Sequence, residues 1–118
     1  AVGHDAINVL ERILDDCKIE GEYWPFARDI VEKVLENFSS VDNIIGELAS
    51  DWPLSQIAIV DKNVLRMAIS ELRWCSERVP EKAVLNEAVE LAKRFGSESS
   101  PSFVNGVLGS HMKAGLAI

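Results

Sequence analysis

The stretch EKAVLNEAVELAKRFGSESSPSFVNGVL, residues 81–108, decides the fold. Apolar residues recur every three to four positions on both sides of the polar turn GSESSPS, which is typical of two amphipathic helices. Pro80 is expected to open the first helix and Gly96 to end it. The stretch therefore predicts a helical hairpin whose turn is flanked by two aromatic residues, Phe95 and Phe103.

The second helix of this hairpin has its own start signal. Ser100 is expected to be its N-cap and Pro101 its first residue, where the missing N–H of proline costs nothing. Asn105–Gly106 would suggest a hairpin turn elsewhere, but here it lies inside a helical period. We therefore expect Gly106, like Gly46 further upstream, to mark a place where another helix comes close.

Upstream of this hairpin the apolar residues also follow a helical period. A strand-like alternation is found nowhere, so the sequence predicts an all-α domain of about six or seven helices. Ser39 or Ser40 is expected to cap the third helix, and one helical turn is expected after Pro53. The remaining helices are expected over residues 6–17, 25–38, 39–49 and 61–79.

Asp61 begins the helix that precedes the hairpin. As an N-cap, its carboxylate would accept hydrogen bonds from the amides of Asn63 or Val64 and would complement the helix dipole. Val60 before the cap and Leu65 in the first turns would then form a hydrophobic staple. Simple capping is therefore the structural interpretation of Asp61.

Length and composition fit one folded domain. The chain has 118 residues, of which 47% are hydrophobic, and its mean hydropathy is +0.06. No apolar run approaches the roughly 20 residues of a membrane span. The two cysteines, Cys17 and Cys75, form no CxxC pair, so a reduced, cytoplasmic protein is expected.

The charge is distributed unevenly along the chain. The formal net charge is −7; residues 1–61 hold 13 acids and 4 bases, whereas residues 62–118 hold 6 acids and 8 bases. A surface that meets a polyanion is therefore expected in the second half. The whole chain would still be repelled by nucleic acid at long range, which argues against RNA binding without a basic partner.

No catalytic or metal-binding motif is present. The two histidines, His4 and His111, lie near the ends without ligands at suitable spacing, so neither a metal nor a cofactor is expected. Asn86, Glu87 and Glu90 share one helical face and could suggest acid–base work or a dimetal site. A solvated face explains them better, and we expect no enzymatic activity.

Three blocks of the sequence resemble the NusB family of bacterial transcription antitermination factors. They are VDKNVLRMAISEL, VPEKAVLNEAVELAKRFG and SFVNGVL, in the order and spacing of the family. The resemblance implies two packed helical bundles. We expect an N-terminal bundle over residues 1–60, a C-terminal bundle over 61–108, and a tail over 109–118.

The resemblance also implies a function without catalysis. NusB proteins bind boxA RNA from ribosomal RNA operon leaders as a heterodimer with NusE, a small-subunit ribosomal protein. The complex acts on the RNA polymerase elongation complex, which then resists termination. Two alternatives are an RNA-recognition domain of a ribosomal RNA cytosine methyltransferase and a self-associating helical module that forms a homodimer.

Site residues follow from the same resemblance. The turn and its aromatics would contact RNA, and Asp61 with Lys62 would contact NusE. Core packing is the alternative for both aromatics, and serines stand where some relatives carry charged residues. The expected RNA-binding residues are Lys93, Arg94, Phe95, Ser99, Ser102 and Phe103.

Both ends of the sequence depart from the family pattern. Family members begin with an arginine-rich helix of the form RRxAREaxLqxLY, and the present sequence starts after it. We therefore expect an incomplete N-terminal bundle unless another segment fills that place. Residues 109–112, GSHM, match either a natural extension of the last helix or a remnant of tag cleavage.

Overall fold

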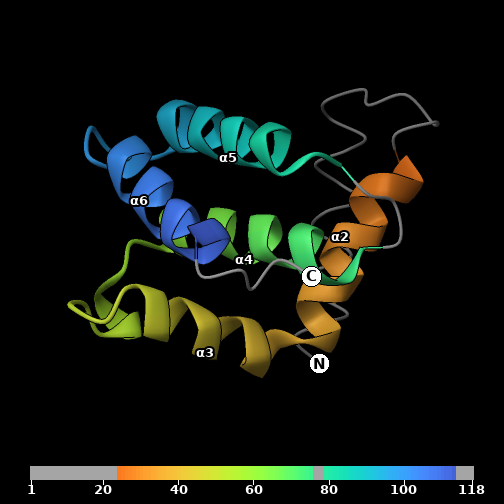
Figure 1. The fold of residues 1–118 in the computed structure, drawn as a ribbon, viewed down its shortest axis with the longest axis horizontal. Helices are drawn as coiled ribbons and strands as arrows, with labels where there is room; N and C mark the ends of the chain where they lie inside the picture. Colours follow the sequence, from red (N-terminus) through yellow and green to blue (C-terminus); the bar gives the residue numbers. More distant parts are fainter. Residues whose placement is uncertain (1–23, 76–78, 114–118) are drawn as a thin grey trace.

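The computed structural model describes residues 24–75 and 79–113. The expected helix over residues 6–17, together with Cys17 and His4, lies outside the described residues. Within them the chain forms five α-helices and one short 3₁₀ helix, and no strand (Figure 1). The elements are α2 (Trp24–Glu36), α3 (Phe38–Leu48), η1 (Leu54–Gln56), α4 (Ile59–Trp74), α5 (Glu81–Phe95) and α6 (Ser100–Lys113). The all-α prediction is confirmed.

Helix α4 is the centre of the arrangement. It contacts α2, α3, α5 and α6, while α5 and α6 form the helical hairpin predicted from residues 81–108. Figure 1 shows α2 crossing one end of the molecule, and the α5–α6 turn at the opposite end, above the segment that follows α3. Two connections distant in sequence therefore lie at the same end of the molecule.

The core is built from the apolar stripes of these helices. Leu65 and Ile69 of α4, Ile45 of α3 and Leu108 of α6 are fully buried. Burial of one such side chain stabilises the fold by about 1.5–3 kcal/mol. The apolar stripe of α4 and the residue that follows the helix are buried throughout: Val64, Leu65, Ala68, Leu72 and Cys75.

The boundary between α2 and α3 differs from the prediction. The expected helix over residues 25–38 ends at Glu36, and α3 begins at Phe38 with Asn37 as its N-cap, so the serine caps predicted at 39 and 40 were wrong. Phe38 lies outside the core: it is 39% exposed, and its ring lies beneath the guanidinium of Arg66, whose central carbon is 4.5 Å from the ring centroid.

The predicted N-cap at Asp61 was also wrong. Helix α4 begins two residues earlier, at Ile59, with Ala58 in the cap position and no capping side chain. Val60 therefore lies inside the helix, and the predicted staple with Leu65 is not at the helix start. Asp61 keeps its place in the first turn, where a carboxylate still complements the helix dipole.

The glycines behave differently from the prediction. A Cβ at Gly46 or Gly106 would meet nothing within 4 Å, so neither marks a close helix approach. Gly96 does end α5 as predicted. Its φ of −98° is open to any residue, but a Cβ there would collide with the Ser100 side chain and lie 2.7 Å from the Ala92 carbonyl oxygen. Packing of the turn therefore selects glycine at this position.

Helix α6 continues past the boundary expected at residue 108. It runs to Lys113, so the start of the predicted tail is helical, and His111 within it is fully buried. The proposed division into bundles of residues 1–60 and 61–108 remains a prediction. No helix in the described part of the chain is long and apolar enough to cross a membrane.

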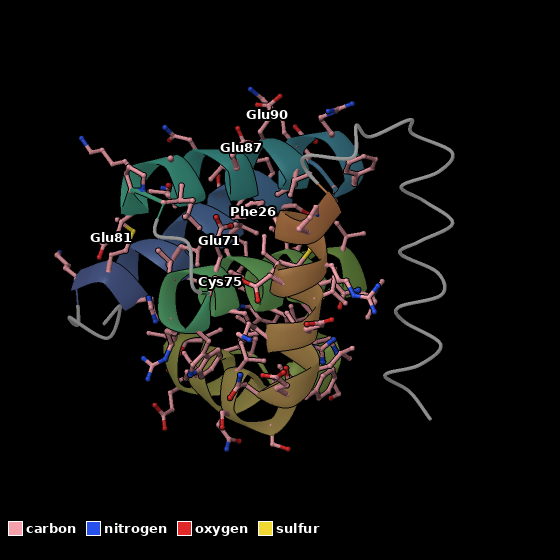
Figure 2. The ribbon with its side chains drawn as sticks, turned by 90° about the vertical axis from the view of Figure 1, so that its right-hand side faces the viewer. Phe26, Glu71, Cys75, Glu81, Glu87 and Glu90 are labelled. Atoms are coloured by element: carbon pink, nitrogen blue, oxygen red, sulfur yellow. The ribbon has the colours of Figure 1, made fainter. Side chains whose placement is uncertain are left out.

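The Cys75 thiol joins α4 to α2. It is buried and free, and it lies near the Asp29 carboxylate. Burial first, and then the neighbouring Asp29 carboxylate, raises the pKa of Cys75 to about 12. Figure 2 shows Cys75 and Glu71 on the side of α4 that faces α2. Because it stays protonated at neutral pH, this thiol is a packing group and a poor nucleophile.

Acid is expected to destabilise the protein through His111. Burial, followed by the nearby Arg73 guanidinium, lowers the pKa of His111 below 6.5, against an opposing effect of Glu81. The unfolded chain therefore takes up this proton at a higher pH than the folded protein does. The free energy of unfolding should fall as the pH drops below 6.5, until the lower folded pKa is reached.

Urea unfolding at about pH 7.5 and about pH 5.5 would measure this loss. The matched variant His111→Leu removes the titrating ring while keeping an apolar side chain in the core. Its stability should change less between the two pH values than that of the parent protein. Equal changes in both proteins would show that His111 is not the responsible group.

Candidate functional site

The turn between α5 and α6 is held by serine hydroxyls. The amide of Ser97 donates to the Ser100 hydroxyl at 2.9 Å, and the hydroxyls of Ser97 and Ser100 lie 3.2 Å apart. Ser100 is fully buried and is the first residue of α6, so its hydroxyl closes the turn instead of forming the predicted N-cap bond. These bonds give the exposed hydroxyl of Ser99 a defined position, 3.3 Å from that of Ser97.

A groove of about 300 Å³ opens beside this turn. One part of its lining comes from the turn and the start of α6, and the other from the segment between α3 and α4 and from the first turn of α4. Its lining residues are Trp52, Gln56, Ile57, Ala58, Asp61, Ser97, Ser99 and Phe103. The groove therefore joins two parts of the chain that are about 40 residues apart.

Asp61 is the chemically unusual member of this lining. Its side chain is only 7% exposed, and Oδ1 is buried without a hydrogen-bond partner in the described part of the chain. A buried acceptor left unsatisfied costs about 1–3 kcal/mol, more when it is charged. The groove is thus a place where a hydrogen-bond donor or a cation from another molecule would be stabilised.

The two aromatics at the turn differ in their environment. Phe95 is 63% exposed, so core packing is the wrong interpretation for it. Phe103 is partly buried, packs against the core, and also lines the groove. The guanidinium of Arg94 lies over the Phe95 ring at 5.5 Å from its centroid, and exposed Lys93 precedes it. Phe95 and its basic neighbours therefore form a solvent-facing aromatic and cationic surface.

The groove brings together only some of the predicted site residues. Ser99, Phe103 and Asp61 line it, although the first two were expected to meet RNA and the third a protein partner. The others are not among its lining residues. Ser102 is exposed on α6, Lys62 is partly exposed on α4, and Lys93, Arg94 and Phe95 lie at the end of α5.

Sequence reasoning missed Trp52 and Gln56. Trp52 is 56% exposed and lines the groove, and Gln56 ends the short helix η1 that was expected after Pro53. In this segment only a helical turn after Pro53 was expected. A tryptophan directly before a proline in a short connection is the sequence signal that would have identified this part of the groove lining. Large aromatic side chains are uncommon on surfaces that bind no partner.

The carboxylates considered for chemistry lie elsewhere. Asn86, Glu87 and Glu90 are exposed on α5, and Figure 2 shows Glu90 pointing away from the body of the molecule. Glu71 is different, because burial first and then the nearby Glu87 carboxylate raise its pKa. In the described ranges, no cluster of histidine, cysteine and acidic residues has the geometry of a metal site.

Comparisons with known proteins agree with the sequence resemblance. The NusB family model matches residues 2–113. The transcription antitermination protein NusB of Chloroflexus aggregans is 50% identical over 108 residues, which cover 91% of this chain and 72% of the relative. That of Roseiflexus sp. is 45% identical over 111 residues, covering 93% of this chain and 78% of the relative.

The fold comparison gives the same result. A solved structure of T. maritima NusB is 37% identical in sequence and superimposes with a TM-score of 0.81. The match covers 90% of this chain and 73% of that chain. Sequence and fold therefore agree over most of the molecule, and the chain belongs to the NusB family of transcription antitermination proteins.

Proposed function

We propose that this chain is a transcription antitermination factor that binds boxA RNA of ribosomal RNA operon leaders together with NusE. In this proposal the pair acts on the RNA polymerase elongation complex, and no catalysis is involved. The observation that carries it is the turn between α5 and α6, where an exposed aromatic stands beside two basic side chains. Membership of the NusB family supports the same assignment.

Single-stranded RNA would bind at the α5–α6 turn. Unpaired bases stack on aromatic rings beside basic groups, at about 1–3 kcal/mol per base. Phe95 is available for stacking because most of its surface is exposed, and Lys93 and Arg94 would contact phosphates. Phe103 presents a second ring, and the hydroxyls of Ser99 and Ser102 would donate hydrogen bonds to RNA.

The partner NusE would bind at the start of α4. Asp61 Oδ1 is buried in the groove and has no partner among the residues that the structure describes, so a cationic or N–H group of NusE would relieve an unsatisfied acceptor. Lys62, next in the helix, is partly exposed and would meet an acidic or carbonyl group. A basic partner would also compensate for the formal net charge of −7, which opposes RNA binding by this chain alone.

RNA binding measured by fluorescence anisotropy tests the proposal. A boxA-like oligonucleotide and a scrambled oligonucleotide of equal length are compared at one salt concentration, with and without NusE. We expect weak binding by the chain alone, and selective, tighter binding of the boxA-like strand when NusE is present. Equal affinity for both oligonucleotides in both conditions would refute the proposal.

A further inference from the structure

The residues proposed to meet RNA and the residue proposed to meet the protein partner share one groove. Ser99 and Phe103 contribute one part of its lining, and Asp61 contributes another. These residues line one groove of about 300 Å³, and physiological salt screens a charge over ~8 Å. The Asp61 carboxylate is therefore close enough to influence a polyanion that binds at the turn.

The surroundings of Asp61 strengthen this influence. The side chain is 7% exposed, so little water screens its charge, and Oδ1 has no hydrogen-bond partner among the described residues. Charges interact more strongly at such a partly desolvated site than in bulk water. The apolar faces of Trp52, Ile57 and Phe103 line the same groove and further limit solvation.

We propose that Asp61 couples the two binding events: it opposes RNA while unpaired and ceases to do so once a cationic side chain of the partner occupies the groove. The inference rests on the function proposed above and adds the mechanism of its partner dependence. Neutralisation of Asp61 by the partner would remove repulsion from phosphates at the turn. By linkage, bound RNA would strengthen partner binding by the same factor.

The variant Asp61→Asn tests the coupling, because it removes the charge while preserving the shape of the side chain. Glu36→Gln is the matched control, with the same change in net charge on an exposed residue of α2, the helix that crosses the end of the molecule opposite the α5–α6 turn (Figure 1). RNA affinity is measured by anisotropy with the boxA-like oligonucleotide, with and without saturating NusE. Thermal unfolding of each variant confirms that it is folded.

Without NusE, Asp61→Asn is expected to bind RNA about fivefold more tightly than the parent protein, and Glu36→Gln about equally. With saturating NusE, the affinities of parent and Asp61→Asn should converge, so the enhancement by NusE shrinks by the same factor. NusE binding measured without RNA should weaken in Asp61→Asn, since the cation loses its partner.

The experiment distinguishes failure of the proposed coupling from failure of the proposed function. If the parent protein binds RNA selectively with NusE, but Asp61→Asn behaves as Glu36→Gln does in both arms, the coupling is overturned and the proposed function stands. If the parent protein binds neither oligonucleotide selectively in either condition, the proposed function fails, and the coupling fails with it.

Discussion

Replacing Arg66 by methionine is expected to lower the free energy of unfolding by about 2–4 kcal/mol. The guanidinium of Arg66 forms a bidentate ion pair with the Asp42 carboxylate. Nε donates to Oδ1 at 2.8 Å, and Nη2 donates to Oδ2 at 2.9 Å. It also donates to Asn63 Oδ1 and lies over the Phe38 ring. Both charged side chains are mostly buried, at 12% and 15% exposure, so removal of one leaves the other poorly solvated.

A double-mutant cycle with Asp42→Asn measures this interaction by urea unfolding. The two single variants should each be destabilised, and the double variant should be destabilised by less than their sum. Additive effects would mean that the ion pair between α3 and α4 contributes little. Because the segment between these helices carries Trp52, a loosened pair is also expected to disturb the groove.

Replacing Phe95 by leucine is expected to weaken binding of the boxA-like oligonucleotide, measured with NusE present, by about 1–3 kcal/mol, or roughly 5- to 150-fold. The ring is 63% exposed, so its loss should leave the free energy of unfolding nearly unchanged. Leucine keeps the apolar surface but has no π-face on which a base can stack.

Phe95→Tyr is the matched control, because it keeps an aromatic ring at the same position. It should retain most of the RNA affinity that Phe95→Leu loses. Equal losses in both variants, or no loss in either, would contradict stacking at this position. Phe103→Ala is less diagnostic, because this ring also packs against the core and its removal should lower stability together with RNA affinity.

The sequence by itself determined the class of fold and most of the helices. Apolar periodicity is a local property of the chain, and it predicted the α5–α6 hairpin; the helical turn after Pro53 was also expected from local sequence. Pro80 disfavours helix at the residue before it and glycine is a common residue after a helix end, so these two local signals also placed the ends of α5 correctly. The three sequence blocks quoted above were sufficient to identify the resemblance to the NusB family.

The wrongly predicted N-cap at Asp61 is an example of a helix start that local sequence signals did not determine. An aspartate before an apolar stripe is a good N-cap signal, but the helix begins at Ile59 instead. The preceding connection reaches the core through Ile57, which is buried, and the helix starts two residues later, after Ala58. Packing of this connection, which depends on distant residues, set the helix start.

Only the tertiary structure decided which predicted residues belong together. The sequence placed Phe95 and Phe103 symmetrically about one turn, yet the first is exposed and the second packs against the core and lines the groove. It also gave no sign that Asp61, Trp52 and the serine turn would meet. Helical periodicity records which face of a helix is apolar. The packing of α4 between α3, α5 and α6 brings two distant connections together, and it leaves Asp61 Oδ1 between them without a partner in the described part of the chain.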